Sequence, residues 1–339
     1  MQTMKAQVLK KPTLIDQFPL VLSDVPEPDP GQGQVRILAQ ACGVCRTDLH
    51  VVEGELSLPK LPVVPGHQVV GVVDRLGKST GKYRKGDRVG VSWLHWACGD
   101  CPNCKQGKEN LCPSARFTGY TVDGGYAQYL VAPEDFVYPI PNGFPDTQAA
   151  PLLCAGVIGY RSLRLSEVQP GQTLGMYGFG GSAHVVIQVA IHWGCQVRVF
   201  TRSKAHQKLA RSLGASWAGT AEDGKADSLD SAIVFAPDGN LVPVALEHVR
   251  RGGTVALAGI YMSPIPEMAY ELLYGERTLR SVANSTRQDV QELLSLAAQI
   301  PIRTEVEVFP LSLANQALKA LKDSKITGAA VLEIPQPGH

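Results

Sequence analysis

The sequence carries little charge, and neither sign is in excess. Only 19% of the 339 residues are charged, and 32 Lys and Arg against 31 Asp and Glu give a net charge of +1. A nucleic-acid-binding domain carries a strong basic excess, so this composition argues against such a partner. With 44% hydrophobic residues, the chain is long enough for two globular domains, each with its own core.

Long apolar runs are also missing. No segment is apolar over the length needed to cross a bilayer, and the first residues, MQTMKAQVLKKP, lack the apolar core of a secretory signal. We therefore expect a cytoplasmic protein that does not insert into a membrane. Because thiols stay reduced in the cytoplasm, the eight cysteines need an explanation other than disulfides.

Half of these cysteines lie in one short segment, CGDCPNCKQGKENLC, at positions Cys98, Cys101, Cys104 and Cys112. Glycine, proline and asparagine between them supply tight turns that let the sulfur atoms converge. Four thiolates make a closed tetrahedral zinc site with no open position, so we predict a structural zinc here and no chemistry. A disulfide framework is the alternative, but a chain of this length does not need such cross-links.

The N-terminal part is typical of a β-rich domain. Between Met4 and about Asp87, β-branched runs such as VRILA (35–39) and VVGVVDRLG (69–77) alternate with Gly and Pro, which predicts many short strands. Two segments there carry reactive side chains, GVCRTDLH (43–50) and PGHQVVG (65–71). Each by itself fits ordinary structure, a hydrogen-bonded histidine in a turn or a small buried cysteine.

The second part predicts a dinucleotide-binding fold. The run TLGMY is followed by the glycine turn GFGGSA (178–183) and by helical apolar spacing up to Gly194. Gly178 permits the tight turn, Gly180 lets the backbone approach a pyrophosphate, and the helix beginning beyond Gly181 offers free N–H groups to the phosphate. Ser182 lies in the same turn, and Ala183 replaces the third glycine. Further strands at 196–200, 232–235 and 254–260, with helices between them, predict a doubly wound parallel sheet.

The end of the second strand of this sheet bears on the cofactor. An NAD site typically has an acid there, but the strand runs into Thr201, Arg202 and Ser203, with Lys208 further along the next helix. The guanidinium of Arg202 has the geometry to bind a 2′-phosphate, so NADP(H) is favoured over NAD(H). An exposed basic helix face is the alternative interpretation.

Together and in this order, these segments resemble the zinc-dependent alcohol dehydrogenases of the medium-chain dehydrogenase/reductase superfamily. The resemblance runs from GVCRTDLH through the cysteine segment to PLLCAG (151–156) and the glycine turn. It implies an α/β fold with a mostly-β GroES-like catalytic domain at 1–152, which includes a zinc lobe at 95–113. A Rossmann domain with a doubly wound parallel sheet would follow at 153–287, and residues 288–339 would return to the catalytic domain. The active site would lie in the cleft between the domains.

The resemblance also implies roles for particular residues. Cys45, His67 and Cys154 would bind a catalytic zinc with one position left open. Thr47 and His50 would move the hydroxyl proton, Asp48 would orient His67, and Arg287 would contact the cofactor pyrophosphate. Trp93 and Leu94 would line the substrate pocket, with Trp96, Leu56 and Leu58 as weaker candidates. A turn-stabilising role for Asp48, helix-start charge for Arg287 and core packing for the aromatics are the alternatives.

The predicted ligand set fits oxidoreductase chemistry. Two thiolates and a neutral imidazole cancel the charge of Zn²⁺ and leave a Lewis acid that can bind an alcohol oxygen. We therefore expect two zinc ions per chain, an alcohol or aldehyde as substrate, and NADP(H) or NAD(H) as hydride carrier. The resemblance further suggests a homodimer or homotetramer.

One position departs from the family pattern. Members usually have a glutamate directly after the ligating histidine, where this chain has Gln68. Without that negative charge we expect a more electrophilic zinc. Comparing pH profiles of Gln68→Glu and wild type would test this, and an unchanged acidic limb would remove the idea.

Three other functions remain open at this stage. A polyol dehydrogenase would keep most of these residues, and a zinc-free quinone or enone reductase would keep the glycine turn but would not need Cys45, His67, Cys154 and the lobe together. A non-enzymatic zinc-binding module would explain the lobe alone. Beyond the Rossmann part, amphipathic helices are expected from near Gln288 and over SLANQALKALKDS, the latter with Ser312 as N-cap, before a closing strand AAVLEI.

Overall fold

The computed structural model describes residues 2–337 and forms two compact units. Within the described part, unit 1 comprises residues 2–154, 284–299 and 304–337, and unit 2 comprises Ala155–Ala283 and Ile300–Arg303. No helix within residues 2–337 combines the length and apolar character needed to cross a bilayer.

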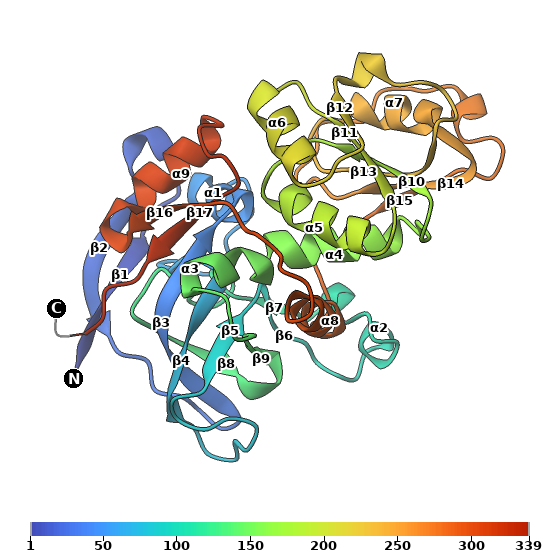
Figure 1. Ribbon diagram of the computed structural model, residues 1–339. Helices are drawn as coiled ribbons and strands as arrows, with labels where there is room; N and C mark the ends of the chain where they lie inside the picture. The colour runs from blue at the N-terminus through green and yellow to red at the C-terminus, as the bar shows by residue number, and fades with distance from the viewer. Residues whose placement is uncertain (1, 338–339) are drawn as a thin grey trace. The chain divides into compact units, whose positions relative to one another are not determined.

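Unit 1 is built mainly from β-strands, as the sequence predicts (Figure 1). Its strands are β1 (Thr3–Leu9), β2 (Leu20–Pro26), β3 (Gln34–Val44), β4 (Gln68–Leu76), β5 (Arg88–Val91), β6 (Leu94–Trp96), β7 (Arg116–Phe117), β8 (Tyr129–Pro133), β9 (Val137–Pro139), β16 (Val306–Pro310) and β17 (Ala329–Glu333). The main sheet has the order β16-β17-β3-β4-β5-β9, and β8 pairs with β3. Strand β17, from the end of the chain, pairs with β3 from its beginning, so the last segment completes the same sheet.

The long strands β3 and β4 hold the core of unit 1. The β-branched runs expected as strands lie in them, and Val35, Ile37, Val69 and Val73 are almost fully buried. Side chains of this shape pack well on a pleated surface covered by neighbours. The sheet thereby fixes the ends of β3 and β4, next to which Cys45 and His67 lie.

Helix α1 (Arg46–Glu53), which follows β3 directly, was not predicted from the sequence. The helix begins after Cys45, whose backbone N–H donates to the carboxylate of Asp48 at 2.9 Å, and ends at Gly54, with φ 76°. A carboxylate in the first turn that accepts the N–H of the residue before the helix, and a left-handed glycine after its end, are common helix boundaries. A short helix thus places Thr47, Asp48 and His50 inside a β-rich unit.

The other helices of unit 1 are short or come from the C-terminal part of the chain: α2 (Pro102–Lys105), α3 (Asp146–Ala149), α8 (Arg287–Ala297) and α9 (Ala314–Lys322). The expectation of Ser312 as N-cap of the last helix is wrong. Ser312 lies within the 3₁₀ turn η7 (Leu311–Leu313), whose Leu311 is buried and which runs directly into α9 at Ala314. The turn itself leads the chain into the helix, so no side-chain cap is formed there.

Unit 2 is a doubly wound parallel sheet, as predicted. Its strands are β10 (Thr173–Tyr177), β11 (Gln196–Phe200), β12 (Trp217–Gly219), β13 (Leu229–Val234), β14 (Val249–Leu257) and β15 (Thr278–Ser281), in the order β12-β11-β10-β13-β14-β15. All neighbours in this sheet run parallel. Helices α4 (Ala155–Leu165), α5 (Gly181–His192), α6 (Lys204–Ser212) and α7 (Leu241–His248) pack on both faces of the sheet (Figure 1).

The strand order of unit 2 locates the ligand-binding edge. Strand β10 lies between β11 and β13, so the chain moves outward in one direction after β10 and in the other after β13. In such sheets ligands bind beyond the carboxyl ends of the strands at this switch point. The glycine turn 178–183 and the segment 201–203 both follow strands at this edge.

Candidate active site

Three side chains far apart in sequence converge in unit 1. Cys45 precedes α1, His67 precedes β4, and Cys154 follows the 3₁₀ turn η4 (Ala150–Leu153). Their ligand atoms all lie within 4.8 Å of one another, and Cys45 Sγ lies 3.3 Å from His67 Nε2. Tetrahedral zinc with its usual bond lengths separates such ligand atoms by roughly 3.5–3.8 Å, so this arrangement fits zinc. A zinc ion held by these three side chains would have a fourth coordination position open.

Asp48 connects two of these three residues. Its Oδ1 lies 3.0 Å from His67 Nδ1 and accepts a bond from the Gly66 N–H at 3.2 Å, while Oδ2 accepts from the Cys45 N–H. The sequence left two roles open for Asp48, and this carboxylate forms the contacts of both. With the proton on Nδ1 directed at the carboxylate, His67 presents the lone pair of Nε2 to a metal.

The charges around His67 favour a cation. Burial by itself would lower the pKa of His67, but the negative charges of Asp48 and Cys45 outweigh it and raise the pKa to about 10. The hydrogen bond with Cys154 and burial raise the pKa of the Cys45 thiol. The negative groups around the centre of the site therefore stabilise a positive charge there. A divalent ion bound by thiolates would supply that charge.

Two further predicted site residues, Thr47 and His50, lie on helix α1, close in sequence to Cys45. Both are buried, with about 9% of their surface exposed. His50 Nδ1 contacts the carboxylate of Glu55, a residue that the sequence analysis missed. The chain folds back after Gly54, and the Glu55 N–H donates to the His50 carbonyl at 3.0 Å. The only signal in the sequence was an acid directly after the helix-ending glycine.

Gln68 is the first residue of β4 and is buried. It pairs with Gly43 of β3, where an added Cβ would lie 2.8 Å from the Gln68 side chain. Gly43 is therefore required by the close approach of this amide. The effect of the missing negative charge at position 68 stays a prediction.

An aromatic cluster adjoins His67. The Trp93 ring contacts His67 edge-on at 4.9 Å between centroids and stacks with Phe117 at 5.1 Å and Tyr120 at 5.8 Å. The Tyr120 hydroxyl donates to the Ser57 carbonyl at 2.6 Å, which fixes the outer ring. Phe117 and Tyr120 were missed because only the folded chain brings them to Trp93.

The other predicted pocket residues have different contacts, and their role in the pocket stays a prediction. Leu94 is fully buried at the start of β6, where it pairs with Phe117, and the Trp96 ring lies 5.4 Å from the guanidinium of Arg116. Leu56 and Leu58 are half-buried against the core of unit 1. Of these aromatic and apolar candidates, Trp93 has the direct contact with His67.

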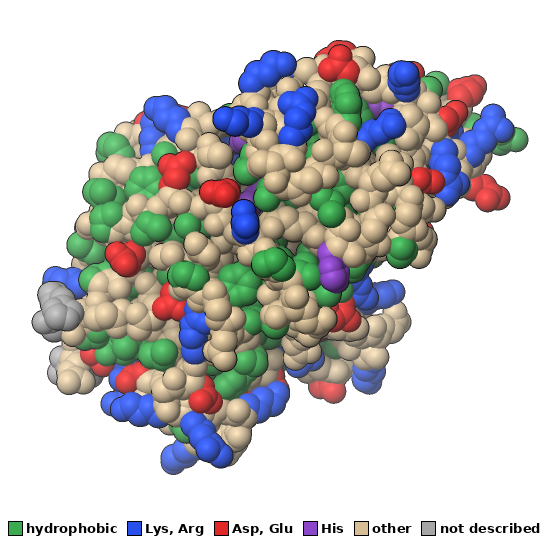
Figure 2. Space-filling model, in the orientation of Figure 1, with side chains coloured by type: hydrophobic (Ala, Val, Ile, Leu, Met, Phe, Trp, Pro, Cys, Tyr) green, Lys and Arg blue, Asp and Glu red, His purple; other side chains and the backbone are tan. Residues whose placement is uncertain are grey.

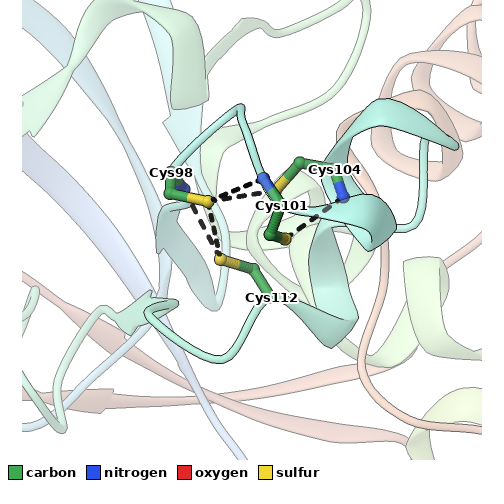
Figure 3. Close-up of side chains that lie close together, drawn as sticks. All are labelled: Cys98, Cys101, Cys104 and Cys112. Carbon is green, nitrogen blue, oxygen red and sulfur yellow. Dashed lines mark hydrogen bonds between the residues drawn. The ribbon is translucent and has the colours of Figure 1, made fainter.

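The four cysteines of the lobe also converge (Figure 3). Cys98 Sγ lies 3.6 Å from Cys112 Sγ and 3.9 Å from Cys104 Sγ, and it accepts a hydrogen bond from the Cys101 N–H at 3.4 Å. Backbone N–H groups, first that of Cys101, lower the pKa of Cys98 to about 6. Four sulfur atoms at tetrahedral spacing, with donors that stabilise thiolate, fit a structural zinc.

The glycine turn of unit 2 has the geometry expected of a phosphate-binding turn. Gly178 has φ 89°, and an added Cβ would lie 2.8 Å from the Ala236 backbone nitrogen. Space is open around Gly180, the N-cap of α5, and the helix continues through Gly181, Ser182 and the buried Ala183. Only glycine fits at 178, and the bare backbone at 180 can be approached closely.

A basic surface follows β11. Arg202, Lys204 and Lys208 are exposed, and Figure 2 shows basic side chains over α6. Thr201 is tied to the sheet by its N–H, which donates to Gly219 at 2.7 Å, and the Ser203 hydroxyl caps α6 by accepting from the His206 N–H. Glu222, which was not among the predicted site residues, has a pKa below its usual value, chiefly because its carboxylate is hydrogen-bonded by Thr220 and to a smaller extent because Arg202 is positively charged.

Arg287 begins α8 in unit 1. Its backbone N–H and its Nε both donate to Oε1 of Glu109 at 3.1 Å, and its guanidinium lies 4.9 Å from the centroid of the Phe136 ring. The helix is also capped by Thr286 and Asp289. Arg287 is therefore more than a charge at a helix start, because it is bonded to Glu109 of the four-cysteine lobe.

Family models match two parts of the chain. Residues 31–142 match the alcohol dehydrogenase GroES-like domain, and residues 181–299 match the zinc-binding dehydrogenase model. A probable alcohol dehydrogenase of Mycobacterium tuberculosis is 46% identical over 98% of both chains. An alcohol dehydrogenase of Geobacillus stearothermophilus is 36% identical and covers 96% of this chain and 99% of its own.

Solved structures of similar fold support the same family. A cinnamyl alcohol dehydrogenase from Sorghum bicolor superposes with a TM-score of 0.89 at 29% identity, covering 98% of each chain. An acetophenone reductase from Geotrichum candidum, solved in complex with NAD, gives 0.89 at 26% identity, again over 98% of each chain. With a cysteine–histidine trio that fits zinc, a glycine turn on a doubly wound sheet and relatives that match over nearly its whole length, the chain belongs to the zinc-dependent, NAD(P)-dependent alcohol dehydrogenases of the medium-chain dehydrogenase/reductase superfamily.

Proposed function

We propose that this alcohol dehydrogenase interconverts an alcohol and its aldehyde or ketone at the trio Cys45, His67 and Cys154, with NADP(H) as preferred hydride carrier. The convergence of the three ligand atoms within 4.8 Å is the observation that carries the proposal. A zinc ion bound there supplies a Lewis acid for the substrate oxygen, and the nicotinamide supplies or accepts the hydride.

The residues of α1 would handle the proton of the substrate hydroxyl. Thr47 lies in the first turn of α1, two positions after the proposed ligand Cys45, and His50 lies about one turn further along the helix. We assign the first proton transfer to Thr47 and the transfer towards solvent to His50. The Glu55 carboxylate, about one-third exposed, contacts His50 Nδ1 and so selects its tautomer and links it to water.

The aromatic cluster points to the substrate class. Trp93, Phe117 and Tyr120 present apolar ring surface next to His67, which favours an alcohol with a flat apolar body over a polyol. The relatives include a cinnamyl alcohol dehydrogenase of Rauvolfia serpentina and a mannitol dehydrogenase of Apium graveolens, so both substrate classes occur among them. Rates with a matched panel of benzylic, aliphatic and sugar alcohols test the assignment, and a preference for sugar alcohols would refute it.

For the cofactor, we assign the 2′-phosphate of NADP(H) to Arg202, with Thr201, Ser203 and Lys208 around it. Support comes from the exposed guanidinium and from the absence of an acid directly after β11. We expect Arg202→Ala to lower kcat/KM for NADPH about 10- to 100-fold, the contribution of one or two charge-assisted bonds, and to change NADH little. A tenfold preference of the wild type for NAD(H) would overturn the assignment.

We further propose two zinc ions per chain, one at the trio and one in the lobe. Unit 1 would act as the catalytic domain and unit 2 as the nucleotide-binding domain, and the predicted bounds of 1–152, 153–287 and 288–339 stay a prediction. The reduced thiols that both zinc sites require are the reason for expecting a cytoplasmic location.

Self-association is proposed on the surface of unit 2. Tyr261, Tyr270 and Tyr274 are more than 60% exposed, and β15 pairs only with β14 within residues 2–337. A free sheet edge beside exposed aromatic rings suits pairing with a second copy into a homodimer or homotetramer. Light scattering should report such an assembly, and Tyr270→Glu should weaken it. A wild-type monomer at micromolar concentration would contradict the proposal.

A further inference from the structure

Glu109 is a buried carboxylate within the zinc lobe. It stands between the predicted ligands Cys104 and Cys112, and its side chain is 7% exposed. One of its oxygens, Oε1, accepts both the backbone N–H and the Nε–H of Arg287 at 3.1 Å. A carboxylate removed from water needs partners of this kind, and removing one partner of a buried pair is costly. The contact therefore joins the lobe to the first residue of α8, 178 positions away in sequence.

The pairing leaves most of the guanidinium free. Glu109 occupies only Nε, and Phe136 covers one face of the group at 4.9 Å from its ring centroid. Within residues 2–337 neither Nη1 nor Nη2 of Arg287 donates a hydrogen bond, and the side chain is 41% exposed. Two parallel N–H groups are thus held in place while remaining available to an anion, the arrangement that binds phosphate oxygens in pairs.

We infer that Glu109 is a positioning residue for cofactor binding: it fixes the orientation of Arg287 so that the two free Nη groups meet the pyrophosphate. The inference rests on the proposed function and on the contact with the cofactor pyrophosphate that the family resemblance implies for Arg287. It gives the lobe a second task, because the loop that carries Glu109 is shaped by the four cysteines around it. A metal site that performs no chemistry then acts on cofactor affinity through one carboxylate.

An alternative view makes Glu109 a purely structural residue that keeps α8 attached to unit 1. Loss of such a tie would lower stability without acting on any particular ligand. The positioning role differs because its effect should depend on Arg287 and on the presence of a pyrophosphate in the ligand. Both conditions can be tested by binding measurements that do not involve catalysis.

The test is a double-mutant cycle in the full, zinc-loaded chain, read out by calorimetric titration with ADP-ribose, which contains the pyrophosphate, and with adenosine, which does not. We expect Arg287→Ala and Glu109→Ala each to weaken ADP-ribose binding about tenfold, the size of coupling typical of contacting residues. The double variant should be no weaker than Arg287→Ala alone. Adenosine binding should be the same in all variants, and Glu109→Gln, which keeps an acceptor oxygen, should restore part of the affinity.

Controls separate folding from positioning. Asp100→Ala removes an exposed carboxylate from the same lobe and should leave ADP-ribose binding unchanged. Zinc content identifies any variant whose lobe has opened, and Glu109→Gln then replaces Glu109→Ala in the cycle. A loss in Arg287→Ala with none in the Glu109 variants would overturn the positioning role alone. An unaffected Arg287→Ala would remove Arg287 from the cofactor site and overturn both assignments, and additive losses would also refute the inference.

Discussion

Asp48 accepts hydrogen bonds on both oxygens, from His67 Nδ1 at 3.0 Å and from the Cys45 backbone at 2.9 Å. One buried carboxylate therefore orients a predicted metal ligand and begins the helix that follows another. The pairing explains why the segment GVCRTDLH and the segment PGHQVVG act together, although 21 positions separate Gly66 from Cys45 and each segment is unremarkable by itself.

Substituting Asp48 should weaken the catalytic metal site selectively. We expect Asp48→Asn to lower zinc affinity at the trio about 10- to 100-fold, because the partner behind a metal-binding histidine sets its tautomer and basicity. Competition with a chromogenic chelator measures this affinity. Asp24→Asn, which removes an exposed carboxylate paired with Lys5, is the matched control. Equal zinc retention in both variants would contradict the role of Asp48.

The aromatic cluster predicts a change in substrate preference. Trp93→Ala should lower kcat/KM for a benzylic alcohol about tenfold more than for a short aliphatic alcohol, since a lost aromatic contact costs about 0.5–1.5 kcal/mol beyond its buried area. Tyr120→Phe, which loses only the hydrogen bond to Ser57, should have a smaller effect. Steady-state rates with both alcohols decide the matter. Parallel losses for the two substrates would place Trp93 outside the substrate pocket.

The His50–Glu55 pair predicts a defect in proton transfer. General acid–base groups typically contribute about 10²–10⁴-fold, so His50→Gln should lower kcat by about 100-fold and Glu55→Gln by less. Cofactor binding should be unchanged in both. A solvent isotope effect on kcat that grows in the variants would identify proton transfer as the affected step. Wild-type kcat in His50→Gln would remove the pair from the reaction.

Histidines buried without charge predict a loss of stability in acid. Burial lowers the pKa of His184 from 6.5 to about 4, and its Nε2 has no hydrogen-bond partner within residues 2–337. Between these two values the unfolded chain binds a proton that the folded chain does not, so stability falls as the pH falls through this window. The limit is about 3 kcal/mol, from about 1.4 kcal/mol per pKa unit.

Urea unfolding at several pH values measures this effect. Stability in wild type should decline from pH 6.5 towards pH 4, and His184→Gln should decline less steeply because an amide does not titrate. His192→Gln, at an exposed position on the same helix, should follow the wild type. Identical slopes for His184→Gln and wild type would show that His184 takes no part in the decline.

Local sequence patterns predicted much of the fold. The runs TLGMY and QVRVF coincide with β10 and β11 because a short apolar run between turn residues has few alternatives. The four-cysteine lobe could also be predicted from the sequence, because its four thiols lie within one segment. Helix α1 was not predicted because its sequence, RTDLHVVE, lacks a clear apolar period and lies among strands. The hydrogen bond that the Cys45 N–H donates to Asp48 defines its start more than helix propensity does.

Contacts between distant segments could not be predicted from the sequence. Nothing in the sequence pairs Glu109 with Arg287 or Tyr120 with Ser57, because each pair forms only when separate elements fold together. The trio was predicted through the family resemblance, and its geometry required the folded chain. Likewise, the sequence around Ser312 resembled a helix N-cap. In the structure Ser312 lies within a 3₁₀ turn whose Leu311 is buried, and this turn leads directly into α9.

The central claim is that Cys45, His67 and Cys154 form one metal site that is separate from the four-cysteine lobe. Elemental analysis of the purified chain tests it most directly, with Cys154→Ser beside the wild type. The account predicts two zinc ions in the wild type and one in the variant, which should remain folded but lose activity. A variant that keeps both ions, or a wild type that binds only the ion of the lobe, would contradict it.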